Sequence, residues 1–183
     1  MSEPLKFAIR PCFEMDLPFV QLIYAHHVLT GMGSFETEPP DLKEMSARWT
    51  RIAAREWPYL VACGISDPTR IFGFAYAAQF RERSAYARTF EDSVYVAPNA
   101  MGRGVGFALL GALLSQLDAM QVREVLALIG DSANAASISV HARAGFRHIG
   151  VMSAVGFKYG RWLDVVLMQR TMRSAADEPM KKP

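Results

Sequence analysis

Three glycines at alternate positions, Gly102, Gly104 and Gly106, lie between an apolar stretch that ends at Pro98 and a strongly helical one. Glycine has no Cβ atom, so backbone N–H groups can approach an anion closely, and the helix N-terminus adds the positive end of its dipole. The chemistry that fits is the binding of a phosphate or pyrophosphate. A dinucleotide fingerprint would need glycine at Phe107, and a P-loop needs a Gly-Lys-Ser/Thr ending, so neither motif is present. A plain strand-to-helix turn is the structural alternative.

The elements that must hold this turn follow from the hydrophobic periodicity of the chain. Asp16, Asp41 and Asn134 are predicted to cap three helices, and a fourth helix begins in the glycine turn. Strands are predicted where apolar residues alternate or run continuously. The predicted strands are residues 7–10, 59–64, 71–79, 93–97, 125–129, 146–157 and 162–170. The order β-α-α-β-β-β-α-β-α-β-β predicts a mixed α/β fold in which helices cover one sheet.

Composition sets the broad class. The chain has 183 residues, of which 51% are hydrophobic and 21% charged, and its formal net charge is +2. These values predict one domain over residues 1–172, followed by a disordered tail over residues 173–183. Lys and Arg are scattered, which argues against a nucleic-acid partner. No apolar stretch reaches the roughly 18 residues of a membrane span, and the N-terminal residues predict no secretory signal.

Cysteine and histidine usage bears on compartment and metal binding. Cys12 and Cys63 are too few for a disulfide framework and match no zinc or redox spacing, so a cytoplasmic location with reduced thiols is expected. His26 and His27 are adjacent on a predicted helix and point in different directions, which is poor geometry for a shared metal ion. We therefore expect no metal site.

Two longer segments carry a family resemblance. Residues 94–106, which run from a strand through the glycine turn, resemble motif A of the GNAT superfamily of N-acetyltransferases, and residues 134–146 look like its motif B. The sequence departs from the family at Met101, where Gln or Arg is usual, and at Ala25, where relatives often carry Asn. The resemblance implies the GNAT fold, a central, mixed and mostly antiparallel twisted sheet flanked by helices.

Further segments are similar to the phosphinothricin acetyltransferase branch of that superfamily. They are residues 34–39, 91–96 and 156–164. The whole resemblance covers about residues 7–170. This branch acetylates small amino-acid-like amines such as phosphinothricin and methionine sulfoximine. The resemblance therefore implies acetyl transfer from acetyl-CoA to the α-amino group of such an acceptor, by direct attack and without a covalent enzyme intermediate.

The resemblance also implies roles for single residues. Glu91 matches the family's proposed base, which takes a proton from the amine directly or through water. His141 stands where the branch has a histidine that can act as acid or base, and a helix histidine that only faces the sheet is the alternative. The pyrophosphate is expected at the glycine turn, and the pantetheine arm along the strand before it. The residues implied for acetyl-CoA are Val94, Tyr95, Val96, Gly102, Arg103, Gly104, Val105, Gly106, Phe107, Asn134 and Ser137.

For the acceptor, guanidinium groups suit both the carboxylate of an amino acid and a second anionic group. The residues expected around the acceptor are Phe35, Arg81, Arg83, Tyr86, Lys158 and Trp162. Lys158 and Trp162 are expected to close the pocket, from the same chain or from a partner subunit, because the family implies a homodimer. Loop arginines that are merely solvated are the alternative.

Two other functions are consistent with the same motifs. A protein N-terminal acetyltransferase would need an open peptide groove in place of a closed pocket. A non-catalytic acyl-CoA-binding module would keep Gly104 and Gly106 but would tolerate the substitution Glu91→Gln.

Overall fold

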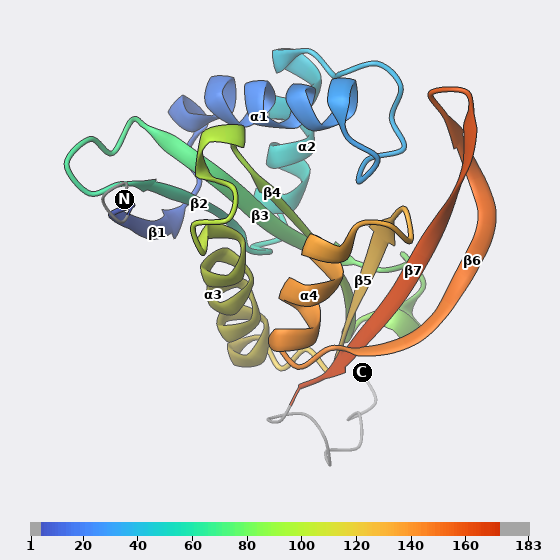
Figure 1. The fold of residues 1–183 in the computed structure, drawn as a ribbon. Coiled ribbons are helices and arrows are strands. Elements are labelled where there is room, and N and C mark those ends of the chain that lie inside the picture. The colour runs from blue at the N-terminus through green and yellow to red at the C-terminus, as the bar shows by residue number, and fades with distance from the viewer. Residues whose placement is uncertain (1–4, 173–183) are drawn as a thin grey trace.

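The computed structural model describes residues 5–172, in which one sheet carries helices on both faces (Figure 1). The expected tail, residues 173–183, lies outside the described residues, as do residues 1–4.

Seven strands pair in the order β1-β2-β3-β4-β5-β7-β6. They are β1 (Phe7–Pro11), β2 (Tyr59–Gly64), β3 (Ile71–Gln79), β4 (Thr89–Val96), β5 (Glu124–Gly130), β6 (Arg147–Lys158) and β7 (Arg161–Thr171). Neighbouring strands are antiparallel except β4 and β5, which are parallel. β2 is buried along its whole length, which accounts for its unbroken apolar sequence. The predicted mixed, mostly antiparallel sheet is confirmed.

The helices are α1 (Leu17–Thr30), α2 (Leu42–Ala53), α3 (Val105–Ala119) and α4 (Ala135–Arg143). α1 and α2 cover one face of the sheet, and α3 and α4 cover the other (Figure 1). Successive residues of β3 point to opposite faces of the sheet. Gly73 faces Val105 of α3. The next residue, Phe74, stacks instead on Tyr95, whose ring centroid lies 5.0 Å from that of Tyr24 in α1. We call these surfaces the α1/α2 face and the α3/α4 face.

The helix caps agree with the sequence at two of three positions. Asp41 and Asn134 accept hydrogen bonds from the backbone N–H three residues further on, at 2.7 and 3.2 Å. Asp16 occupies the predicted N-cap position of α1, but its side chain makes no capping hydrogen bond to that helix. Its buried carboxylate instead accepts two hydrogen bonds from Arg10 of β1, at 2.6 and 2.8 Å. The Phe13 N–H also donates to this carboxylate at 2.8 Å, so a bidentate ion pair and a backbone N–H of the preceding turn satisfy it together.

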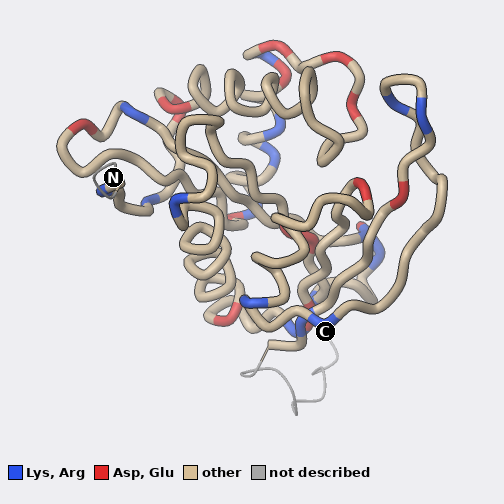
Figure 2. The backbone as a smooth tube through the Cα atoms, in the orientation of Figure 1, with Lys and Arg blue, Asp and Glu red and all other residues tan. Residues whose placement is uncertain are grey.

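Charged positions are interspersed along the described backbone (Figure 2). Within residues 5–172, no helix is both long and apolar enough to cross a bilayer. The same residues contain no group of three or more His, Cys, Asp or Glu side chains that could hold a metal ion. Cys12 and Cys63 are buried free thiols.

Candidate active site

β4 and β5 separate after three residue pairs. The first three residues of β4, which end at Glu91, lie in register with residues 124–126 of β5. Beyond these pairs, residues 92–96 of β4 pair with β3 only, and residues 127–130 of β5 pair with β7 only. The facing edges of these two segments thus carry main-chain N–H and C=O groups that no described strand pairs. We call the space between them the β4–β5 gap.

Hydrogen bonds at both ends of β4 determine which main-chain groups face this gap. The Thr89 C=O accepts a hydrogen bond from the β3 side at 2.9 Å, and the Ala97 N–H donates one to that side at 2.8 Å. Main-chain groups alternate in direction along a strand, so Val94 and Val96 face the gap. The main chain of Tyr95 faces β3 and belongs to the β3–β4 ladder. This corrects the expectation that Tyr95 offers main-chain groups to pantetheine.

A histidine of α1 reaches the same edge of β4. His27 Nε2 lies 2.8 Å from the Val96 carbonyl oxygen and therefore donates to it. Burial lowers the pKa of His27, and this outweighs the opposite effect of the hydrogen bond to Val96. A neutral ring thus fixes one carbonyl of the gap. Sequence reasoning gave His27 no such role, because no local signal links α1 to a strand 69 residues away.

The glycine turn follows β4 and leads directly into α3. Gly102 and Gly104 have φ angles of +70° and +84°, in the left-handed region where a side chain is strained. Gly106 serves a different purpose, since a Cβ atom there would lie 3.3 Å from the Val96 side chain. It allows α3 to pack closely on β4. The N–H groups of the first turn of α3 thus lie beyond the C-terminal end of β4, as an anion site requires.

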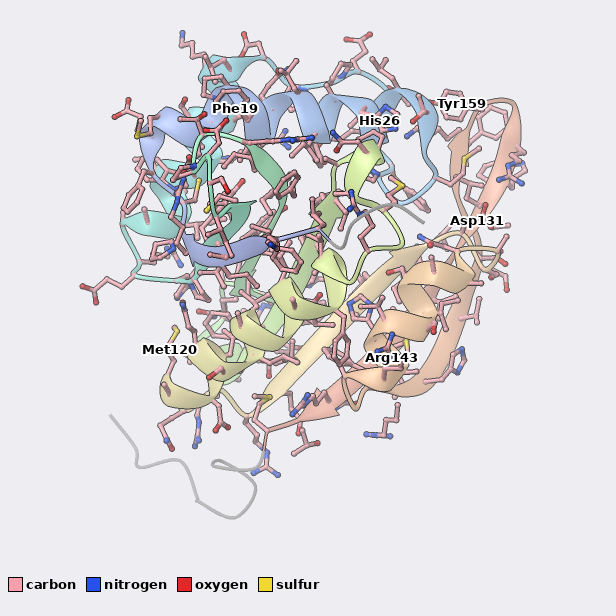
Figure 3. The ribbon with its side chains drawn as sticks, turned by 60° about the vertical axis from the view of Figure 1, so that its left-hand side comes forward. Phe19, His26, Met120, Asp131, Arg143 and Tyr159 are labelled. Carbon is pink, nitrogen blue, oxygen red and sulfur yellow. The ribbon has the colours of Figure 1, made fainter. Side chains whose placement is uncertain are left out.

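A groove of about 640 Å³ lies between α3 and α4, and runs from Phe107 along α3 to Asp118 near its C-terminal end. Phe107, in the first turn of α3, forms one wall, and the Arg143 guanidinium lies 4.5 Å from its ring centroid. Arg143 itself is on α4 (Figure 3). Arg170 and Asp118 also line the groove. The Arg170 Nη1 donates to the Ala144 carbonyl. Sequence reasoning found Phe107 but missed Arg143, whose position in the last turn of α4 was the available signal.

Asn134 and Ser137 lie where β5 ends and α4 begins. The Asn134 Oδ1 caps α4, and its Nδ2 lies 3.5 Å from the Gly130 carbonyl oxygen. The Ser137 Oγ lies 3.4 Å from His141 Nδ1. Both residues, which were expected to contact acetyl-CoA, are therefore near the β5 edge of the gap.

Glu91 lies inside β4, because the strand begins at Thr89, four residues earlier than predicted. Alternation along β4 directs its side chain to the α1/α2 face, opposite Ala78 of β3. Burial raises the pKa of this carboxyl, the charge of Asp92 raises it further, and the charge of Arg81 opposes both. A half-buried carboxyl with a raised pKa suits a general base that works near neutral pH.

His141 lies on the other face, between α4 and the sheet. It is 5% exposed, and its Nε2 lies 3.0 Å from Asp92 Oδ2. Its position is that of a histidine facing the sheet, and it has a carboxylate partner that the sequence did not indicate. Because Glu91 and Asp92 are consecutive in β4, the strand separates Glu91 from His141.

Two residues expected at the acceptor hold the α1–α2 loop in this chain. The Phe35 ring occupies space that a side chain at Gly130 or Gly156 would need. Lys158 Nζ donates to two carbonyl groups of the α1–α2 loop, at 2.9 and 2.7 Å. Burial lowers the pKa of Lys158. Lys158 therefore anchors the loop that carries Phe35.

The remaining acceptor residues lie in two separate places. Arg81, Arg83 and Tyr86 are exposed in the connection between β3 and β4. The charge of Arg81 acts on Glu91. Trp162 is 65% exposed and lies in the β6–β7 hairpin. The tip of that hairpin rests on α1, where the Tyr159 hydroxyl donates to a carbonyl at 2.7 Å (Figure 3).

A cavity of about 510 Å³ opens on the α1/α2 face. Its floor contains stacked aromatic rings whose centroids lie 5.1 to 6.4 Å apart. These rings are Tyr59, Phe74 and Tyr76. Ala78, the cross-strand partner of Glu91, also lines the cavity, as do Arg51 of α2 and Arg55, two residues beyond the end of that helix. Sequence reasoning missed both arginines, since Arg55 lies in the turn after α2 and no helix face joins the two.

Known proteins share this arrangement over most of the chain. The model of the Acetyltransferase (GNAT) family matches residues 21–146. The phosphinothricin N-acetyltransferase of Alcaligenes faecalis is 48% identical over 166 residues, which cover 91% of this chain and 83% of that protein. The L-methionine sulfoximine/L-methionine sulfone acetyltransferase of Pseudomonas aeruginosa is 34% identical over 172 residues, 94% of this chain and 98% of that protein.

A solved structure extends the likeness to three dimensions. The phosphinothricin acetyltransferase of Sinorhizobium meliloti, crystallised in complex with AcCoA, has a TM-score of 0.89 and 37% identity, and the match covers 98% of this chain and 94% of that one. With its glycine turn, its parted parallel strands and a family match over residues 21–146, this chain belongs to the GNAT family of acetyltransferases.

Proposed function

We propose that this acetyltransferase transfers the acetyl group of acetyl-CoA to the α-amino group of a small amino-acid-like acceptor, of the phosphinothricin or methionine sulfoximine type. The observation that carries the proposal is the β4–β5 gap, which is lined by main-chain groups that no described strand pairs and has the Glu91 carboxyl beside it on the α1/α2 face. The names of the relatives with 48% and 34% identity support the acceptor class.

The α3/α4 face is the proposed side of entry for acetyl-CoA. The glycine turn and the first turn of α3 would hold the pyrophosphate through backbone N–H groups. The main-chain groups of Val94 and Val96 would pair with the amides of the pantetheine arm, as a neighbouring strand would. The groove with Arg143 and Phe107 suits the nucleotide end, since a guanidinium binds phosphate and an aromatic ring stacks on a base.

The chemistry is attack by a neutral amine on a thioester carbonyl, after which the carbon–sulfur bond breaks and the thiolate leaves. Glu91 would accept the amine proton on the α1/α2 face, directly or through one water. A gap-facing N–H, of Val94 or Val96, would donate to the developing oxyanion. Because the amine attacks the thioester directly, no enzyme nucleophile is needed. Cys12 and Cys63 are buried in the core.

For the acceptor, the positive charge beside Glu91 is the supporting feature. Arg81 acts on Glu91 from the β3–β4 connection, and Arg51 and Arg55 line the adjacent cavity. An amino acid brings a carboxylate, and a phosphinate brings a second anion, which guanidinium groups bind well. The aromatic floor of the cavity suits the aliphatic part of such an acceptor.

A homodimer is part of the proposal, with the outer surface of β6 and its hairpin as the interface. β6 is an edge strand with several exposed apolar side chains, and such edges are usually covered in soluble proteins. The residues concerned are Ile149, Val151, Val155, Phe157 and Trp162. Light scattering should give twice the mass of the chain, and Val155→Glu should reduce it. The free thiols Cys12 and Cys63 support a reducing, cytoplasmic compartment.

Release of the coenzyme A thiol tests the function directly. We expect turnover with phosphinothricin, methionine sulfoximine or methionine sulfone, and slower turnover with ordinary amino acids. Turnover restricted to peptide N-termini would replace the proposal with protein acetylation. Binding of acetyl-CoA without turnover on any amine would leave a binding module.

A further inference from the structure

The last peptide of β4 leads from the strand toward the glycine turn, and it lies where β4 and β5 have parted. The last residue pair between the two strands is Glu91 with Leu126, so Val96 lies well beyond it. The Ala97 N–H of this peptide donates to the Phe72 carbonyl on the β3 side at 2.8 Å. The Val96 carbonyl points the other way, into the β4–β5 gap, where no described strand pairs with it.

A side chain of α1 holds this carbonyl in place of a strand. His27 Nε2 lies 2.8 Å from the Val96 carbonyl oxygen, a normal length for an N–H···O hydrogen bond. A carbonyl oxygen can only accept, so the ring proton is on Nε2. Burial and the charge of His26 lower the pKa of His27 against the opposing effect of the hydrogen bond to Val96. The ring is therefore neutral at pH 7, with Nδ1 unprotonated.

The His27 ring is itself held in place by the fold. Its centroid lies 5.4 Å from that of Tyr95, the residue that precedes the bonded carbonyl in β4. The end of α1 that carries His27 is also fixed by the β6–β7 hairpin, because the Tyr159 hydroxyl donates to the Val28 carbonyl at 2.7 Å. The donor that faces the gap thus has a defined position before any ligand binds.

Val96 also contacts the helix that follows the glycine turn. A Cβ atom at Gly106 would lie 3.3 Å from the Val96 side chain, so α3 begins directly against this residue. The Val96 carbonyl is held by α1, and its side chain packs against α3. Val96 therefore fixes the strand edge proposed for pantetheine relative to the turn proposed for the pyrophosphate. A carbonyl oxygen has two lone pairs, so one remains for an amide N–H of pantetheine when His27 occupies the other.

We propose that His27 is a positioning residue for acetyl-CoA, which holds the Val96 carbonyl in the direction that an amide N–H of the pantetheine arm requires. This inference rests on the part of the proposed function that places acetyl-CoA along the gap. His27 does for this carbonyl what β5 does for the paired part of β4. A carbonyl that is fixed before the ligand arrives has less freedom to lose on binding, so acetyl-CoA binds more tightly.

Calorimetric titration tests this role without any turnover. His27→Leu removes the donor, whereas His27→Gln keeps an N–H at a similar distance from the helix. We expect the dissociation constant of acetyl-CoA to rise about 5- to 10-fold in His27→Leu and to stay within about 2-fold of wild type in His27→Gln. His26→Leu is the matched control and should bind as the wild type does, because His26 Nε2 lies 3.2 Å from Thr30 Oγ1 of its own helix.

A shorter ligand separates positioning from a general structural effect. Adenosine 3′,5′-diphosphate keeps the nucleotide of acetyl-CoA and lacks the pantetheine arm. Its dissociation constant should be the same in the wild type and in His27→Leu. Three results would overturn the proposal: unchanged acetyl-CoA binding in His27→Leu, equal weakening of both ligands in that variant, or binding to His27→Gln as weak as to His27→Leu. Thermal unfolding checks that each variant is folded.

Nitrogen NMR of the histidine rings tests the contact itself. The chain has four histidines, and the ring signals that are lost in His27→Gln belong to His27. We expect a neutral His27 ring at pH 7 with its proton on Nε2. A proton on Nδ1 alone would contradict the contact, because the ring could then not donate to Val96.

The same measurements separate this role from the rest of the proposed function. A wild-type protein that binds acetyl-CoA and acetylates no amine would remove the proposed transfer and leave the role of His27 intact. A wild-type protein that does not bind acetyl-CoA would remove both.

Discussion

The two faces of β4 use the same kind of residue in opposite ways. Glu91 and Asp92 are consecutive carboxylates, yet the pleat of the strand sends one to α1 and α2 and the other to α3 and α4. Glu91 is half-buried, and burial and the charge of Asp92 raise its pKa against the opposing charge of Arg81. Asp92 is paired with His141 and committed to that pair. A carboxyl that must exchange protons is left without a close cation, whereas one that must hold a neighbour in place is paired.

The largest effect should come from removing the unpaired carboxyl. Glu91→Gln keeps the size of the side chain and removes the base, so we expect kcat to fall roughly 10²- to 10⁴-fold. The dissociation constant of acetyl-CoA should not change, because acetyl-CoA would bind on the other face. Stopped-assay kinetics and calorimetry measure the two quantities. A rate near that of wild type would remove Glu91 from the role of base.

The α3/α4 face can be disturbed by one methyl group. Gly104 has a φ of +84°, so Gly104→Ala strains the turn by about 1–2 kcal/mol, and we expect the KM of acetyl-CoA to rise about 10-fold. The KM of the acceptor should stay the same. Gly150→Ala is the control, because its Cβ would meet nothing within 4 Å and its φ is ordinary. Equal effects of the two variants would contradict a site at the turn.

A substitution on the α1/α2 face should affect the acceptor and not acetyl-CoA. Arg81→Gln removes a cation that lowers the pKa of Glu91, so that pKa should rise and the acidic limb of kcat/KM should move to higher pH. We also expect the acceptor KM to rise about 5- to 20-fold, with that of acetyl-CoA unchanged. Arg83→Gln, two residues away in the same connection, shows whether the effect belongs to Arg81. An acidic limb that moves to lower pH would exclude this arrangement.

The smallest effect concerns stability. The pKa of His141 is raised in the folded chain, so the pair with Asp92 stabilises fully below the unfolded pKa of about 6.5, and this contribution is lost as pH rises through the folded value. Between pH 6 and pH 9 the free energy of unfolding should fall by about 1 kcal/mol more in the wild type than in Asp92→Asn. Urea unfolding at both pH values measures the difference, and equal slopes would mean that the pair adds no pH-dependent stability.

What the sequence reveals depends on the range of the interaction. The element order was predicted correctly because periodicity is local, and the glycine turn was found because φ and close packing select glycine directly. The start of β4 was missed because Glu91 and Asp92 interrupt its apolar pattern.

The position of Asp16 at the start of α1 was predicted, but the partner of its side chain was not, because Arg10 lies in the preceding strand and not in the helix. The pair of Asp92 and His141 could not be predicted, since 49 residues separate them and only the sheet brings them together. The anchoring role of Lys158 is hidden for the same reason, because the carbonyl groups that it binds are more than 120 residues away.

β4 and β5 are joined by three residue pairs, and this short pairing has a consequence for engineering. The strands on one side of it, β1 to β4, all come from the chain before α3, and those on the other side, β5 to β7, all come from the chain after it. A cut in the connection at residues 120–123 would therefore produce two fragments that each keep their own strand pairs. Acetyl-CoA bound at the gap would touch both fragments and would therefore favour their reassembly. The molecule is thus a natural starting point for a split reporter of acyl-CoA concentration.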